Sequence, residues 1–253
     1  PLSEQPTNEK QITLVNIVPQ NEDNAQESYN LQYTISFSRE DLSFNKIQGY
    51  DLVTMKDCSY LTEYGKPLLP AKRLLIALPK DMKATNIQVL SLQKQTLSGL
   101  YTISPAQQPK KLGETSPSIF DLRFNRAAYL SPLPYPERLV TLGPQNDLAG
   151  QSMVEITIFP LQYLPLQKKL SLVTSITVIV EGVTGYTCGD YLSDHISENG
   201  YAMYQELVEN MVVNPEQVSL QTSPNPQPLG VGPGDYDYVI ITQTSWVTAF
   251  QPL

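Results

Sequence analysis

The sequence predicts a mainly β protein: a β-sandwich or barrel-like domain with one C-terminal helix, then a linker and the first strand of an α/β domain. Short runs rich in Val, Ile, Leu and Tyr recur up to about Gly182, and clusters of Pro, Gly and Asn separate them. After Gly182 the hydrophobic spacing changes to that of a helix. Many short strands with turn residues between them are typical of sandwiches and barrels.

The clearest strand is the alternating run at 29–37. Its large side chains share one face of the strand and alternate with polar residues: Tyr29, Leu31, Tyr33, Ile35 and Phe37. Further strands are expected at residues 11–18, 50–55, 74–78, 87–92, 100–103, 154–159 and 170–180. Most of the 21 prolines stand where such a strand would end, as in Leu78-Pro79.

One helix is expected within residues 190–213. Ser193 or Asp194 could cap its N-terminus, and Asn214-Pro215 would end it. Its apolar side chains fall at i, i+3, i+4 and i+7: Tyr204, Leu207, Val208 and Met211. This stripe is expected to pack on the sheet or on the next domain.

The predicted organisation is a β-rich domain at 1–213, a Pro/Gly/Ser linker at 214–234 and the start of an α/β domain at 235–253. The run Tyr236-Asp-Tyr-Val-Ile-Ile-Thr242 is typical of a buried strand in a parallel sheet, and such a sheet needs βαβ crossovers to be stable. We therefore expect the chain to be the front part of a larger protein. No window is long and apolar enough for a membrane span, and a signal peptide, if there was one, is already removed.

The charge is uneven along the chain. The formal net charge is −8, and all 17 Lys and Arg lie at or before Lys169, whereas residues 170–253 hold nine acids and no base. Nucleic-acid binding requires clustered Lys and Arg that neutralise phosphates. The acidic half and the lack of basic stripes therefore argue against a nucleic-acid partner.

No catalytic or metal-binding constellation is evident, so no catalytic residue, metal or cofactor is predicted. The single histidine, His195, follows Cys188 by seven residues, but no glycine-rich nucleophile turn surrounds either one. The two cysteines, Cys58 and Cys188, allow one disulfide or two free thiols.

The acidic residues Asp190, Asp194 and Glu198 would share one face of the expected helix and could hold calcium, although solvated charge is the more common reading. Gly230-Val-Gly-Pro-Gly234 precedes a strand instead of following one, so it is not a phosphate-binding loop.

Four Pro/Tyr-rich motifs follow one another along the chain: Tyr64-Gly-Lys-Pro-Leu-Leu-Pro70, Leu74-Leu-Ile-Ala-Leu-Pro79, Tyr129-Leu-Ser-Pro-Leu-Pro-Tyr-Pro136 and Ile158-Phe-Pro-Leu-Gln-Tyr-Leu-Pro165. In this order, and with the helix, the linker and the run at 236–242 after them, they resemble the N-terminal prosegment of gingipain-like cysteine peptidases. The resemblance spans about residues 60–253.

The resemblance implies a β-rich prosegment of a secreted cysteine endopeptidase, which assists folding and keeps its own downstream caspase-like catalytic domain latent. The catalytic His and Cys would lie beyond residue 253, so this chain alone would not be an enzyme. The way in which prosegments of this family keep the peptidase latent resembles substrate mimicry by a basic side chain on a loop. The candidates here are Lys110 and Lys111 in the Pro-flanked stretch 104–113, then Arg123 and Arg126.

One feature departs from the family pattern. The resemblance implies maturation by cleavage after Arg or Lys near the end of the prosegment, yet residues 170–253 contain neither. The alternative function is a secreted β-sandwich module for binding or surface attachment, in which some of the 15 tyrosines contact protein or carbohydrate. Such a module would not explain the α/β-type strand after the linker.

Overall fold

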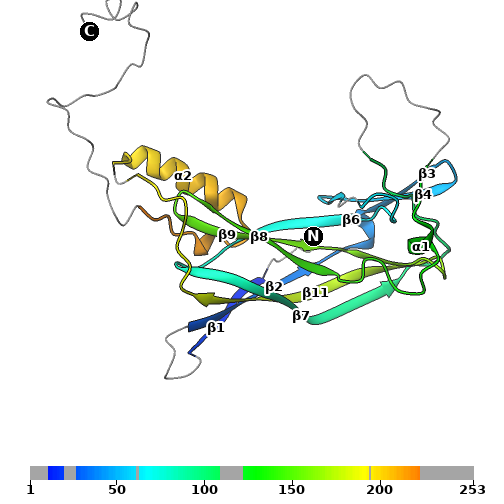
Figure 1. Ribbon diagram of the computed structural model, residues 1–253, viewed down its shortest axis with the longest axis horizontal. Helices are drawn as coiled ribbons and strands as arrows, with labels where there is room; N and C mark the ends of the chain where they lie inside the picture. Colours follow the sequence, from blue (N-terminus) through cyan, green and yellow to red (C-terminus); the bar gives the residue numbers. More distant parts are fainter. Residues whose placement is uncertain (1–10, 20–26, 61–62, 109–121, 194, 223–253) are drawn as a thin grey trace, which may run out of the picture.

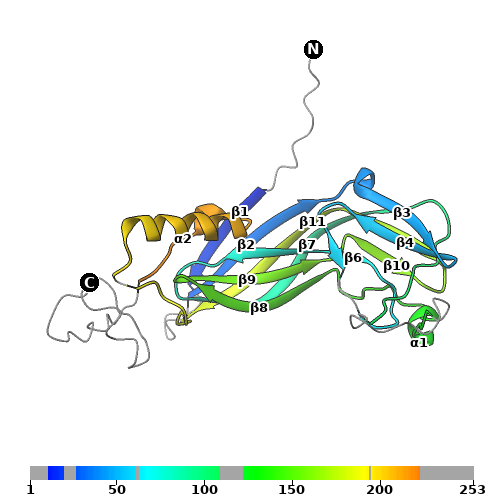
Figure 2. The ribbon, with the colours of Figure 1, turned by 90° about the horizontal axis from the view of Figure 1, so that it is seen from above.

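The computed structural model describes residues 11–19, 27–60, 63–108, 122–193 and 195–222, with the backbone alone for 11–19 and Glu27. The chain forms two antiparallel sheets that pack face to face, and a helix lies against the outer face of one of them (Figures 1 and 2). Within the described residues no helix is both long and apolar enough to cross a membrane.

The first sheet has the order β1-β2-β11-β10, and β7 pairs with β11. Its strands are β1 (Gln11–Pro19), β2 (Glu27–Ser36), β7 (Met82–Thr96), β10 (Leu161–Leu164) and β11 (Lys169–Thr184). The strand β11 runs between β2 and β7 and pairs with both. Residues 11–19 and 27–36 therefore contribute directly to this sheet.

The second sheet has the order β5-β6-β9-β8. Its strands are β5 (Ser59–Tyr60), β6 (Pro70–Ala77), β8 (Val140–Leu148) and β9 (Gln151–Ile158). A separate hairpin consists of β3 (Leu42–Ile47) and β4 (Tyr50–Met55). The helical segments are η1 (Arg39–Asp41), α1 (Arg126–Tyr129), α2 (Glu198–Met211) and η2 (Pro215–Gln217).

Alternate side chains of β6 point to opposite faces of the sheet and pack into two different hydrophobic clusters. Leu74, Ile76 and Leu78 belong to the main core between the sheets, together with residues of β2, β9 and β11. Leu75 and Ala77 point to the opposite face and join the smaller cluster beneath α2. A third cluster, formed by β4, β10 and the start of β11, fills the other end of the molecule.

The predicted mainly β fold and most of the predicted strands are confirmed. The five alternating side chains of 29–37 all contact the main core, and Tyr29, Leu31 and Tyr33 are buried there. The segment 100–103 is not a strand; it makes one isolated bridge, between Ile103 and Asp51. No strand was predicted at the positions of β3, β5, β8 and β10. In β8 the register shifts between Leu142 and Gln145, where Gly143-Pro144 resembles a turn in sequence.

Gly182 does not end a strand, because β11 continues to Thr184. A Cβ at position 182 would lie 2.0 Å from the ring of Tyr29 on the paired strand β2. The glycine therefore makes room for an aromatic ring of the core.

The helix is shorter than predicted and packs differently. It begins after Ser197, whose hydroxyl accepts from the Gly200 amide at 3.1 Å, so Ser193 is not the cap, and Asp194 lies outside the described residues. Of the predicted stripe, only Val208 is buried, and Tyr204 is partly buried. Leu207 and Met211 stay exposed, because the sheet covers a narrower arc of the helix than the stripe occupies.

The first nine residues of the predicted linker, 214–222, are described and contact the sheets. The side chain of Asn214 is fully buried, its amide donates to the Ala77 carbonyl oxygen at 2.9 Å, and its own oxygen accepts from the Ala77 N–H at 2.8 Å. Leu220 packs into the cluster beneath α2, and the Ser219 N–H donates to the Gln151 side chain. Residues 214–222 thus pack against the β-rich part of the chain, and the predicted domain bounds stay a prediction. The predicted α/β strand at 235–253 lies outside the described residues.

Candidate functional site

The structure describes both flanks of the segment 109–121, which contains the first two inhibitory-loop candidates. The flanks lie at the end of the molecule that carries α1, β3 and β4, and α2 lies at the opposite end (Figures 1 and 2). We refer to these as the loop end and the helix end.

One glutamine side chain joins the two flanks. The amide nitrogen of Gln107 donates to the Arg123 carbonyl oxygen at 2.8 Å, and the amide oxygen of Gln107 accepts from the Arg123 N–H at 3.2 Å. A side-chain amide thereby reproduces the two-bond pairing of neighbouring strands. The chain therefore leaves and re-enters the described structure at adjacent points.

The turn at Gly65 and Lys66 lies between the flanks and bonds to both. The Gly65 N–H donates to the Ala106 carbonyl oxygen at 2.8 Å, and the Ala106 N–H donates to the Lys66 carbonyl oxygen at 2.9 Å. On the other side, the Asn125 N–H donates to the Gly65 carbonyl oxygen at 2.8 Å. Gly65 has a φ of +76°, and a Cβ there would lie 2.9 Å from the Asn125 nitrogen, so the close approach requires glycine.

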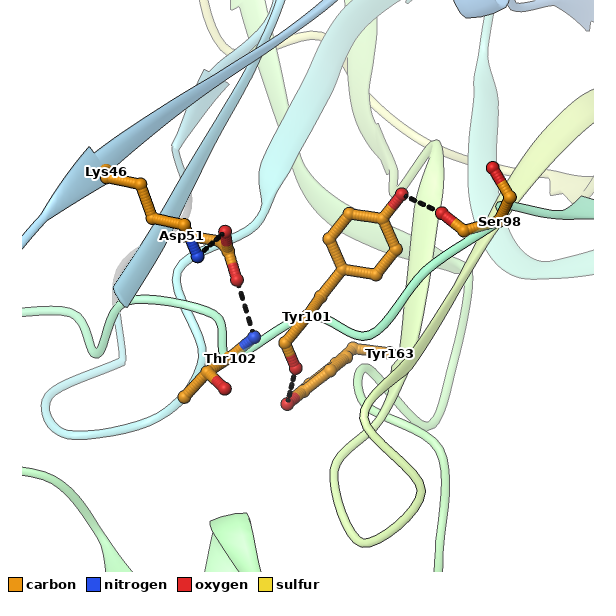
Figure 3. A network of polar contacts seen from close by, with 6 residues as sticks. All are labelled: Lys46, Asp51, Ser98, Tyr101, Thr102 and Tyr163. Carbon is orange, nitrogen blue, oxygen red and sulfur yellow. Dashed lines mark hydrogen bonds and ion pairs between the residues drawn. The ribbon is translucent and has the colours of Figure 1, made fainter. Parts of the chain in front are cut away.

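A polar network fixes the upstream flank (Figure 3). The Asp51 carboxylate accepts from the Thr102 N–H at 2.7 Å and pairs with the Lys46 ammonium at 2.6 Å. The Tyr163 hydroxyl donates to the Tyr101 carbonyl oxygen at 2.7 Å. These bonds supplement the single backbone bridge between Ile103 and Asp51, and they attach the segment 100–103 to β4 and β10.

The short helix α1 fixes the downstream flank. The Asn125 side chain accepts from the Ala128 N–H at 3.2 Å and so caps the helix. The Tyr129 hydroxyl donates to the Ile103 carbonyl oxygen at 2.7 Å and links this flank to the upstream one. Burial raises the pKa of Tyr129, so the hydroxyl keeps its proton and remains a donor.

The four inhibitory-loop candidates fall in different positions. Lys110 and Lys111 lie outside the described residues. Arg123 and Arg126 are exposed on the downstream flank, where the backbone of Arg123 pairs with Gln107, and Arg126 is the first residue of α1. Gly65 lies in the motif at 64–70 and Gln107 in the stretch 104–113, but neither was predicted to hold the flanks together, because their bonds join residues that are distant in the sequence.

The two cysteines are free thiols, so the disulfide alternative is not realised in the structure. Cys58 packs beside the cluster at the loop end and lines a pocket of about 300 Å³ with Lys72 and Asp41. Burial raises its pKa to about 11. Cys188 is buried near the helix end, and its thiol donates to the Asp190 carbonyl oxygen at 3.6 Å. Burial raises the pKa of Cys188 too, so neither thiol has the low pKa of a nucleophile.

Of the three acidic residues of the calcium alternative, the structure describes Asp190 and Glu198. Asp190 precedes α2, and its carboxylate accepts from the Ala149 N–H at 3.2 Å, so it does not share a helix face with Glu198. Within the described part of the chain, no group of three or more His, Cys, Asp or Glu side chains is placed to hold a metal ion.

Comparison with known proteins agrees with this architecture. The family model of the C25 propeptides (Propeptide_C25) matches residues 19–193, more than half of the chain. The chain therefore belongs to this family: it is the prosegment of a gingipain-like cysteine peptidase, and not itself the enzyme. The predicted family resemblance is confirmed.

Two solved structures from Porphyromonas gingivalis are similar in fold. In the complex of the RgpB pro- and mature domains, the matching chain is 19% identical with a TM-score of 0.57, and the match covers 74% of this chain and 93% of that one. In the structure described for the zymogenic latency of gingipain K, the values are 20% identity, a TM-score of 0.53, and coverage of 73% and 96%. No curated protein sequence matches the chain significantly.

Proposed function

We propose that this chain holds the caspase-like catalytic domain of its own precursor latent by presenting the segment 109–121 to the substrate cleft of that domain. Lys110 and Lys111 are the side chains proposed to enter the cleft. The family match supports a prosegment role and favours it over the alternative of a separate binding module. The precursor is proposed to be a secreted or cell-surface endopeptidase.

The observation that carries this proposal is the double hydrogen bond between Gln107 and the backbone of Arg123. A segment that inhibits by occupying a cleft binds more tightly when its ends are already fixed, because less conformational entropy is lost on binding. The Gly65 turn, α1 and the Asp51 network hold the same two flanks. These contacts support the proposal, because they hold the two ends of the segment at a fixed spacing.

The test is inhibition of the separately produced mature peptidase by the chain, followed as hydrolysis of a peptide library. If Lys110 and Lys111 mimic a substrate, replacing both with Ala should weaken inhibition about 100-fold or more, because a paired and desolvated cation is lost. The matched control replaces two exposed lysines at the start of β7, Lys80→Ala with Lys83→Ala. It removes the same charge and should leave inhibition unchanged.

The outcomes separate the parts of the proposal. Inhibition that survives the change at Lys110 and Lys111 would keep the latency role and reject these lysines. A chain that does not inhibit at any concentration would contradict the latency role itself.

A further inference from the structure

The strand β7 forms one edge of the first sheet, and this edge is long and uncharged. Among the described strands, β7 pairs with β11 alone. Residues 84–93 contain neither a charged residue nor a proline. Charges and prolines are among the devices that keep an edge strand from pairing with another chain, because its outward N–H and C=O groups can otherwise bind a further strand. The middle of β7 carries neither device.

One glutamine shows which way the backbone of this edge points. The Gln145 side-chain oxygen accepts from the Ala84 N–H at 3.0 Å, and its amide nitrogen donates to the Met82 carbonyl oxygen at 3.0 Å. These backbone groups therefore point away from β11, as do those of alternate residues along an antiparallel strand. Within the described part of the chain, nothing comparable bonds to the backbone of residues 85–93 on that side. The edge is thus closed at its start and open along its middle.

Three apolar side chains of β7 face the inside of the sandwich beside this open edge: Ile87, Val89 and Leu92. Their partners on β11 are buried in the main core, and cross-strand partners share a face of the sheet. Val89 and Leu92 are nevertheless 42% and 40% exposed. A groove of about 800 Å³ separates them from Val140 and Leu142 of β8. An open backbone edge and an uncovered apolar face therefore meet in one groove.

The described chain ends beside the start of β7. Thr222 and Met82 line the same pocket of about 1040 Å³, and β7 runs from the helix end toward the loop end (Figure 1). The next predicted strand, 235–242, follows after the twelve residues 223–234. Twelve residues span at most about 40 Å, and the open edge is about 33 Å long. The segment 235–242 is therefore within reach of the groove.

We propose that the segment 235–242 adds as a strand to the free edge of β7 and covers the groove between β7 and β8. Its sequence, Asp-Tyr-Asp-Tyr-Val-Ile-Ile-Thr, is rich in aromatic and β-branched residues, which favour strands. In such strand addition the backbone pairs with the edge, while alternate side chains fill the groove. The charges are complementary as well: β7 carries Lys83 and Lys94 without an acid, and the segment carries Asp235 and Asp237 without a base.

A second copy of the chain is a less favourable occupant of the same edge. Two β7 strands would bring only lysines together, with no acid to pair with them. The register of β7 with β11 also shifts at three places, so two such edges would have to match each other's irregularities along their length. A tethered segment of eight residues adapts more easily, and its tether gives it an effective concentration in the millimolar range.

This pairing needs neither the segment 109–121 nor a substrate cleft, so it goes beyond the proposed latency. The segment 235–242 is predicted to belong to a parallel sheet, whose crossover connections come later in the sequence. Parallel sheets form slowly, and an apolar strand that waits for its partners is prone to aggregate. Pairing with β7 shields this strand until the rest of its sheet is available. The free edge of β7 is thereby assigned as a strand-holding site for folding.

The first experiment measures hydrogen exchange at the amides of residues 84–93 in the whole chain at micromolar concentration. The test variant, Val239→Pro with Ile241→Pro, removes two N–H donors from the segment and lies outside the sandwich, so it leaves the sandwich folded. The control, Leu229→Pro with Val231→Pro, places two prolines in the linker. The test variant should exchange about 10-fold faster at the outward amides of β7, as for an affinity of about 0.1 mM at a millimolar effective concentration. Equal exchange in the unmodified chain and the test variant would overturn the proposal.

The second experiment changes the groove instead of the segment. Trp246 is the single tryptophan of the chain and follows the segment by four residues, so its fluorescence anisotropy reports whether the segment is attached. Val89→Glu with Leu92→Glu should lower this anisotropy, because it places charge in the groove. The control is Met203→Glu with Leu207→Glu on α2, where the side chains are 61% and 46% exposed, and it should leave the anisotropy unchanged. Thermal melts establish that both variants fold. An anisotropy that the groove variant does not lower would refute the groove.

The remaining outcomes separate this inference from its rivals and from latency. Protection of β7 that rises with protein concentration, together with sedimentation as a dimer, would assign the edge to a second copy and overturn the proposal. Loss of protection in the proline variant, with inhibition of the mature peptidase retained, would confirm strand holding as a property separate from latency. A chain that protects β7 but does not inhibit would contradict the proposed function alone.

Discussion

The loop end and the helix end are each closed by a side-chain amide that pairs with a backbone residue, but the two amides differ in burial. Asn214 pairs with Ala77 at the helix end and is fully buried, with apolar residues of the α2 cluster around it. Gln107 pairs with Arg123 at the loop end, where water reaches the bonds. A hydrogen bond contributes little when water can replace it, whereas a buried group that loses its partner is costly.

The difference corresponds to two structural tasks. At the helix end, Asn214 joins the segment after α2 to β6 through two buried hydrogen bonds. At the loop end, several half-exposed hydrogen bonds to Gly65, Thr102 and Ile103 together hold the two flanks in place. We expect the loop end to open locally at a lower free energy than the helix end.

The largest effect should follow from Asn214→Ala. The substitution leaves the N–H and the carbonyl oxygen of Ala77 without partners in a buried place, so the free energy of unfolding should fall by about 2 kcal/mol or more. Urea denaturation measures this change. The matched control is Asn199→Ala at an exposed position of α2, which should change stability by less than about 0.5 kcal/mol. Equal effects of the two substitutions would refute the importance of burial at the helix end.

An intermediate effect should distinguish two buried tyrosines. Tyr163→Phe removes the bond to the Tyr101 carbonyl oxygen and should lower the free energy of unfolding by about 1 kcal/mol. Among the described residues the hydroxyl of Tyr33 has no hydrogen-bond partner, so Tyr33→Phe should be neutral or slightly stabilising at pH 7. A loss of stability in Tyr33→Phe as large as that in Tyr163→Phe would contradict this assignment.

Tyr33 should also make the free energy of unfolding depend on pH. Burial raises the pKa of Tyr33 from 10.0 to about 12. The folded state therefore holds this proton more tightly than the unfolded state, and the associated stability is fully present below pH 10 and is lost as the pH rises toward 12. Tyr33→Phe should make the decline of stability between pH 10 and pH 12 shallower, measured by denaturation across that range.

The smallest effect on stability should come from Gln107→Ala, at about 0.5 kcal/mol, because water can replace the bonds that this amide makes to Arg123, Pro105 and Ala106. The substitution should loosen the pairing of the two flanks of the segment 109–121 more than it lowers the free energy of unfolding. Hydrogen exchange at the Arg123 amide should accelerate, and inhibition of the peptidase should weaken. If Gln107→Ala lowers stability as much as Asn214→Ala, the two ends are not held in different ways.

The sequence by itself determined the elements whose burial follows a simple period. The alternation at 29–37 located β2 and its buried face, and the ordered Pro/Tyr motifs identified the prosegment family. The interruption at Gly143-Pro144 concealed β8, and the wide stripe on α2 predicted more burial than the sheet provides. Periodicity reports which face of an element is apolar, but it does not report how much of that face a neighbour covers.

Only the tertiary structure decided what joins distant parts of the chain. Gln107 and Arg123 are 16 positions apart, and Asn214 and Ala77 are 137 apart, so no local pattern marks either pair. The two cysteines allowed a disulfide by count, yet the fold places them as separate thiols at different ends of the molecule. The physical reason is the same in each case: a hydrogen bond or a disulfide depends on distance in space, and the packing of the two sheets sets that distance.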